Sequence, residues 1–132
     1  MKRLLIWILI IGFVLFCAFA IFTFSKIHRQ VEKITMIAMT NFNKNAIESL
    51  TDLINSEKYS FEEKNTAIWA LGQFADPKAL PLLEKLNSET RDQNRCFRKQ
   101  ELCKREIERA IKWCKTGNAT KWMYRKINRQ QD

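Results

Sequence analysis

The first 24 residues contain the strongest hydrophobic pattern in the chain. Residues 4–24, LLIWILIIGFVLFCAFAIFTF, include no charged residue and no proline. A helix of this length rises about 32 Å, which matches a bilayer hydrocarbon core of roughly 30 Å. Inside lipid every backbone amide must bond within its own segment, and a single helix satisfies this condition. The pattern therefore predicts a transmembrane anchor over residues 1–24.

A cleaved secretory signal is the alternative interpretation of this segment. Basic residues precede the apolar run, and residues 18–20, Ala-Phe-Ala, offer a small-x-small cleavage site. The apolar run continues past that site and is longer than a usual signal core, which favours an anchor. Basic residues flank the run on both sides, but the dense positive charge of the short N-terminal tail favours a cytoplasmic N-terminus. We therefore expect a single-pass membrane protein with the bulk of the chain on the periplasmic side.

Beyond the anchor, apolar positions recur at helical spacing. Over residues 25–43 they form one stripe, made by Ile27, Val31, Ile34 and Ala38. This stripe predicts that the first helix continues into water, packs on the next helix and ends in a turn. Further stripes predict helices over residues 46–54, 61–74, 77–86 and 99–115. A polar connection over residues 87–98 separates the last two.

Local signals mark where these helices begin and end. Ser60 precedes two glutamates, an order that places a cap before negative charge in a first helical turn. Asp76-Pro77 predicts a new helix start, because Asp caps and Pro needs no amide bond in the first turn. Gly117 predicts a stop, and residues 118–132 follow as a basic, aromatic tail.

Composition agrees with a helical chain and adds a charge asymmetry. Gly occurs three times and Pro twice, so few residues interrupt helices, and the fold class is predicted as all-α. The net charge is +9, and residues 91–132 hold thirteen Lys and Arg against five Asp and Glu. A basic patch of this kind attracts anionic lipid headgroups, nucleic acid or an acidic protein, although it can equally be a solvated face.

The predicted helices repeat in pairs. Residues 46–53 (AIESLTDL) align with residues 79–86 (ALPLLEKL), and residues 66–74 align more loosely with residues 106–114. Two helical hairpins that repeat in this way predict a short solenoid, since neither hairpin buries its apolar faces alone. A glycine within a helix costs up to ~1 kcal/mol relative to alanine, so Gly72 is expected where another helix comes close.

Residues 62–86 of this chain resemble the HEAT-like repeat family. The residues that match its usual consensus are Ala70-Leu71-Gly72, Asp76-Pro77 and Ala79-Leu80-Pro81. Ala75 departs from the pattern where such repeats often have a second glycine, and the last hairpin has a longer connection. The arrangement is similar to small membrane-anchored bacterial HEAT-repeat proteins of unassigned role. The resemblance implies an α-solenoid of two hairpins over residues 44–117 and a binding surface, and it names no substrate.

Three cysteines follow the anchor. Cys103 and Cys114 are too far apart on one continuous helix to form a disulfide, because bridged Cα atoms lie within about 7 Å. Cys96 lies in the polar connection and could pair with Cys103 or with Cys114 on an oxidising side of the membrane. Three alternatives stay open, a Cys96–Cys103 bridge, a Cys96–Cys114 bridge, and all thiols reduced. The sequence has no Cys-x-x-Cys pair and no His near these cysteines, so it gives no sign of a metal site.

The sequence predicts a binding module and no enzyme or cofactor. It has one His and no Gly-rich phosphate loop or nucleophile–base set. We expect a scaffold that binds a protein partner beside the membrane, through residue types enriched at interfaces, namely Trp113, Trp122, Tyr124, Arg125 and Arg129. Packing that covers the end of the last repeat is an equally good explanation of these residues. Binding of anionic lipid or nucleic acid is the alternative function, and nucleic acid requires a cytoplasmic domain.

Overall fold

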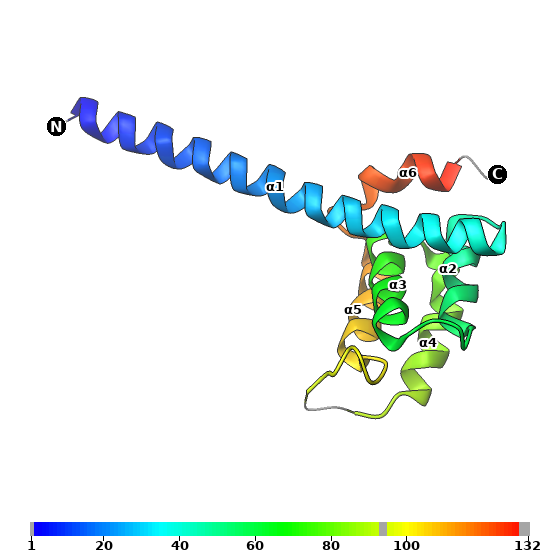
Figure 1. The fold of residues 1–132 in the computed structure, drawn as a ribbon. Coiled ribbons are helices and arrows are strands. Elements are labelled where there is room, and N and C mark those ends of the chain that lie inside the picture. The colour runs from blue at the N-terminus through cyan, green and yellow to red at the C-terminus, as the bar shows by residue number, and fades with distance from the viewer. Residues whose placement is uncertain (1, 93–94, 130–132) are drawn as a thin grey trace. The chain divides into compact units, whose positions relative to one another are not determined.

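The computed structural model describes residues 2–92 and 95–129, and every regular element in these ranges is helical (Figure 1). The elements are α1 (Lys2–Phe42), α2 (Ala46–Asn55), α3 (Phe61–Phe74), the 3₁₀ turn η1 (Pro77–Ala79), α4 (Leu80–Glu89), α5 (Lys104–Thr116) and α6 (Lys121–Arg129). The chain divides into two compact units, residues 1–30 and residues 31–132, so α1 contributes to both. The prediction of an all-α chain is confirmed for the described residues.

The first unit is the apolar part of α1. Its large side chains are exposed, for example Leu9 at 72% and Phe19 at 70%. Within the described ranges, one helix is long and apolar enough to cross a membrane, with a mean hydropathy of 2.8 in its most apolar window. A secretory signal near an N-terminus has the same properties, so both interpretations of this segment remain compatible with the structure.

The second unit begins within α1. Val31 and Ala38 are fully buried and Ile34 is nearly so, as the apolar stripe predicts. The helix ends at Phe42, and Asn43 follows with φ +50°, a left-handed conformation that Asn tolerates. Asn41 Nδ2 then donates to the Tyr59 hydroxyl at 2.8 Å. The end of α1 is thereby tied to the loop between α2 and α3.

Side-chain caps start α2 and α3 where local sequence places them. Asn45 Oδ1 accepts the backbone N–H of Glu48 at 2.9 Å. Ser60 and Glu63 form a capping box, in which the Ser60 N–H donates to Glu63 Oε2 at 2.8 Å and the Glu63 N–H donates to Ser60 Oγ. The predicted start and end of the helix over residues 61–74 are confirmed.

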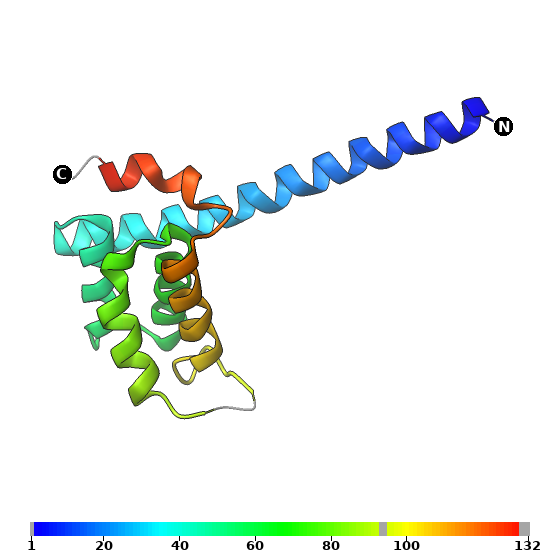
Figure 2. The same ribbon diagram turned by 180° about the vertical axis from the view of Figure 1, so that it is seen from behind.

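Helix α3 is the centre of the second unit. It packs against α2, α5 and α6, while α4 packs against α5. Figures 1 and 2 show α2 to α5 gathered into one bundle, with α3 and α5 side by side. The core is made of fully buried aliphatic residues, chiefly Leu50, Leu53, Ile68, Leu71, Leu83 and Ile107. Burial of each such side chain contributes about 1.5–3 kcal/mol to folding.

The chain turns sharply between α3 and α4. Ala75 caps α3 with φ +49°, a conformation that costs an alanine about 1–2 kcal/mol. Its methyl group is fully buried, which offsets part of this cost. Asp76 then accepts the Lys78 N–H at 2.9 Å, and Pro77 begins the next turn. The predicted restart at this dipeptide is therefore present, first as a 3₁₀ turn and then as α4.

Several predicted boundaries differ from the structure. The helix expected to end at residue 86 continues to Glu89. The helix expected from residue 99 begins at Lys104, because the backbone groups before it bond to a side chain of α3. Residues 121–129, predicted only as part of a basic, aromatic tail over residues 118–132, form α6, which packs on α3. The second unit is thus larger than the domain predicted over residues 44–117, since it also contains the end of α1 and α6.

Candidate functional site

A buried asparagine holds the loop that precedes α5. Asn65 of α3 is fully buried, and its Nδ2 donates to the carbonyl oxygens of Arg98 at 3.0 Å and Glu101 at 2.7 Å. Its Oδ1 accepts the Cys103 N–H at 2.9 Å. One side chain thus satisfies three backbone groups of the loop, and these groups are not available for helical bonds.

A disulfide closes the same loop. The structure joins Cys96 to Cys103 with their Cα atoms 5.3 Å apart, which is one of the three arrangements that the sequence left open. Cys103 is the N-cap of α5 and lies outside the helix, contrary to the prediction of a helix over residues 99–115. Cys17 and Cys114 remain free thiols. The loop over residues 96–103, which we call the stapled loop, is therefore fixed at two points.

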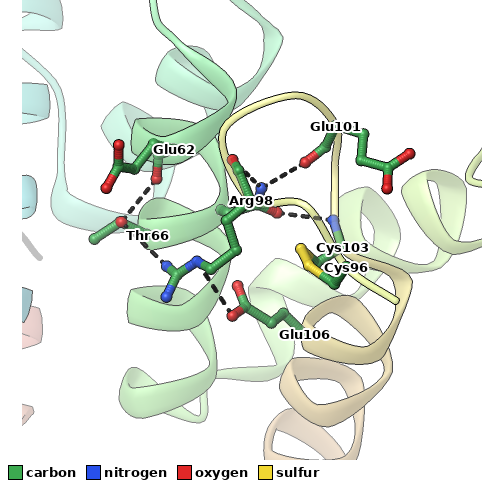
Figure 3. A network of polar contacts seen from close by, with 8 residues as sticks. Glu62, Thr66, Cys96, Arg98, Glu101, Cys103 and Glu106 are labelled. Carbon is green, nitrogen blue, oxygen red and sulfur yellow. Dashed lines mark hydrogen bonds and ion pairs between the residues drawn. A yellow bond between two sulfur atoms is a disulfide. The ribbon is translucent and has the colours of Figure 1, made fainter. Parts of the chain in front are cut away.

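A third set of contacts connects the stapled loop to α3 and α5 (Figure 3). Arg98 Nη2 donates to Thr66 Oγ1 at 3.3 Å, and Thr66 in turn donates to the Glu62 carbonyl at 2.8 Å. Arg98 Nε also lies 3.4 Å from Glu106 Oε1. Burial raises the pKa of Glu106, while the neighbouring Arg98 and Arg109 act in the opposite direction. Arg98 thus pairs with a half-buried carboxylate and holds the loop between two helices.

A hollow of about 680 Å³ lies beside the disulfide. Its walls are Asp92, Arg95, Cys96, Phe97, Lys104, Arg105 and Glu108. Phe97 is 56% exposed although the backbone around it is held by Asn65 and the disulfide. Lys104 Nζ pairs with Asp92 Oδ1 at 2.8 Å. The hollow therefore combines an apolar side chain of the stapled loop with charges of both signs from the residues before the loop and from α5.

The five residues predicted to bind a partner do not form one surface. Tyr124 is 1% exposed, with its ring centroid 5.2 Å from that of Phe74, and burial raises its pKa to about 12. It is a packing residue, and its prediction as a partner-binding residue is corrected. Trp113 is half-buried on α5 and packs over the glycine of α3. Trp122 and Arg125 are exposed on α6, whereas the side chain of Arg129 lies outside the described part of the chain.

The residues assigned to repeat packing lie where α3 meets α5 and where the chain turns into α4. Ala70 is fully buried. A Cβ atom on Gly72 would lie 2.9 Å from Trp113 Cε3 and 3.0 Å from Ala110 Cα. The close approach expected at this glycine is therefore present. Asp76 and Pro77 form the turn, and Pro81 is exposed in the first turn of α4.

The described residues contain no group of three His, Cys, Asp or Glu side chains that could hold a metal ion. Burial raises the pKa of the Cys114 thiol to about 11, and its Sγ donates to the Leu71 carbonyl at 3.8 Å. The thiol is thus protonated and a poor nucleophile at neutral pH.

The sequence analysis did not identify Asn65 as a structural residue. The available signal was a polar residue close to the apolar positions Ala67 and Ile68, near the start of a helix.

No family model, curated protein or solved structure matches this chain. The HEAT-like resemblance of residues 62–86 stays a prediction.

Proposed function

We propose that this protein is a membrane-anchored helical module that binds a protein partner at the stapled loop. The observation that supports this most is that Phe97 is exposed although its backbone is restrained. The disulfide joins the two ends of the loop, and Asn65 of α3 hydrogen-bonds to the backbone between them. Binding residues are commonly found on loops that a rigid scaffold positions. Aromatic side chains that fill a partner's pocket contribute a large share of binding energy.

Preorganisation explains the concentration of restraints around this loop. A disulfide that closes a loop of this length, seven residues of sequence separation, destabilises the unfolded chain by about 2.5 kcal/mol. The three Asn65 hydrogen bonds and the Arg98 contacts add further order. A loop that is already ordered loses little conformational entropy on binding, so more of the contact energy appears as affinity.

The chemistry of the hollow defines the kind of partner. Phe97 offers an apolar anchor, and Arg95, Lys104 and Arg105 outnumber the two carboxylates around it. A complementary segment would contain an apolar pocket beside acidic side chains. We infer a protein partner for this surface because an aromatic group with mixed charges is typical of protein interfaces. We also infer that α2–α3 and α4–α5 are the two HEAT-like hairpins that position it.

The disulfide and the apolar helix together suggest a location. Disulfides persist in oxidising compartments and are rare in the cytosol. We therefore propose that α1 spans the membrane with a cytoplasmic N-terminus, and that residues 31–132 work on the oxidising, periplasmic side. This arrangement agrees with the charge around the N-terminus and argues against nucleic acid as the partner.

Counting the thiols of protein taken directly from cells tests the location and the anchor together. If thiols are trapped with maleimide-polyethylene glycol under denaturing conditions, we expect two additions before reduction and four after it. Cleavage after residue 20 would remove Cys17 and change these numbers to one and three. Four additions without reduction would contradict the disulfide and the oxidising location.

A photo-crosslinking amino acid in place of Phe97 tests the binding surface. In native membranes we expect it to form a discrete adduct, and we expect Phe97→Ala to weaken binding of the same partner about tenfold or more. The same crosslinker in place of Phe61, which is 42% exposed at the start of α3, is the matched control. Equal adducts from both positions, or none from position 97, would argue against the stapled loop as the binding site.

A further inference from the structure

Helix α6 presents two different faces. Tyr124 points inward and packs on the ring of Phe74. Lys121, Trp122 and Arg125 are exposed, and Trp122 is 68% exposed. At 100° per residue, positions 121, 122 and 125 fall within one arc of about 100°, and Trp122 lies about 160° around the helix from Tyr124. The outer face of α6 therefore carries a tryptophan beside two cations.

This face is held in place by polar contacts at the start of the helix. Gln73 of α3 accepts hydrogen bonds from Thr120 Oγ1 at 2.6 Å and from Asn118 Nδ2 at 3.2 Å. Gln73 and Thr120 are both buried, so these bonds form away from bulk water. A helix of nine residues is marginal alone, and these contacts together with Tyr124 stabilise it on the second unit.

The charge on this face is not balanced within the described chain. Several other cations pair with carboxylates, for example Lys44 with Asp52 at 2.7 Å and Lys115 with Glu84 at 2.8 Å. Lys121 and Arg125 form no ion pair with a described carboxylate. Residues 109–131 contain seven Lys and Arg and no Asp or Glu. The outer face of α6 is thus open to an anionic surface.

We propose that the outer face of α6 docks on the anionic phospholipid headgroups of the membrane that holds α1. This inference rests on the proposed anchor. The second unit begins at Val31, seven residues after the apolar run ends, and that length of chain spans at most about 25 Å even when extended. The tether keeps the lipid surface at a high effective concentration.

The residue types on this face favour lipid over other polyanions. Tryptophan is enriched at the level of lipid headgroups, and Lys and Arg beside a membrane span are attracted to anionic lipid. At such a surface each cation raises the docked population about fivefold at low salt. Docking would restrain the second unit beside the bilayer and leave the stapled loop for its partner.

Fluorescence quenching in vesicles tests this inference with the full-length protein. The chain is reconstituted into vesicles with about 30% phosphatidylglycerol, or with neutral lipid alone, each brominated near the headgroup. The difference between the wild type and Trp122→Phe isolates the emission of Trp122 from that of the other three tryptophans. We expect the bromines to quench Trp122 at least about twofold more strongly in anionic vesicles, and the quenching to weaken as salt is raised.

Charge reversal separates docking from simple proximity. The double variant Lys121→Glu, Arg125→Glu changes exposed side chains and is expected to reduce the docked population about 25-fold or more. Lys112→Glu, an exposed position on α5, makes the same kind of charge change elsewhere and is expected to retain docking.

Retention of the protein after alkaline carbonate washing reports the anchor independently. Protein that is retained but shows equal Trp122 quenching in both lipids, or no quenching, would overturn the inference and leave the anchor intact. Protein that is lost in the wash would overturn the anchor and this inference with it. Salt-sensitive binding of single-stranded DNA by retained protein whose Trp122 stays unquenched would assign the face to nucleic acid instead.

Discussion

Replacing Asn65 with Asp is expected to lower the free energy of unfolding by about 3 kcal/mol or more. The side chain is fully buried, and its Nδ2 donates to two carbonyl oxygens at 2.7 and 3.0 Å. In the variant an acceptor oxygen would face these two acceptors. A protonated carboxyl could restore at most one of the two donated bonds, and an ionised one would be an unpaired buried charge. The substitution preserves shape, so the loss comes from the polar contacts of this side chain and not from its packing.

Thermal and denaturant unfolding of the full chain in detergent measures this effect. Gln100→Glu is the matched control, because it makes the same amide-to-acid change on an exposed side chain of the same loop, and it is expected to change stability by less than about 0.5 kcal/mol. Amide exchange should also show lost protection at Cys103, whose N–H bonds to Asn65. A variant that unfolds within about 1 kcal/mol of the wild type would refute the role given to this side chain.

Gly72→Ala is expected to destabilise the second unit by about 2 kcal/mol, although the same change in an open helix position would stabilise it by up to about 1 kcal/mol. The new Cβ would meet Trp113 Cε3 at 2.9 Å and Ala110 Cα at 3.0 Å. The tryptophan ring can shift, but the α5 backbone cannot move without opening the interface between α3 and α5. Overpacking therefore outweighs helix propensity at this position.

Two further variants distinguish overpacking from a general effect of alanine. Gly12→Ala places a Cβ where nothing lies within 4 Å and is expected to leave the unfolding of the second unit unchanged. Ala110→Gly combined with Gly72→Ala removes the Ala110 Cβ, which would lie 3.1 Å from the new Cβ, and should recover part of the loss. If Gly72→Ala instead raised the melting temperature, the close approach of α3 and α5 would be wrong.

Short-range signals predicted α2, α3 and the turn that leads into α4 well. Ser60 and Glu63 are three residues apart, so the capping box depends only on local chain geometry. Asp76 and Pro77 likewise determine their turn without help from distant residues. The glycine at position 72 correctly indicated a close helix contact, because a glycine inside a helix needs a compensating reason. These boundaries were therefore readable from residues near in sequence.

The start of α5 and the existence of α6 depended on partners far along the chain. Asn65 lies 38 residues before Cys103, and its bonds to the loop prevent the helix from starting earlier. Helix α6 needs the ring of Phe74 and the amide of Gln73, which lie in α3. The pairing of Cys96 was also undecided by spacing alone, since the loop could have reached either remaining cysteine of this unit.

The sequence by itself determined the helical class, the apolar N-terminal segment, the helix caps and the excess of positive charge at the C-terminal end. These properties arise from composition and from residues within a few positions of one another. Only the tertiary structure decided that Asn65 fixes the stapled loop, that Phe97 stays exposed on it, and that Tyr124 faces inward while Trp122 faces outward. The physical reason is that a buried hydrogen bond or a packed ring has meaning only once its distant partner is in place.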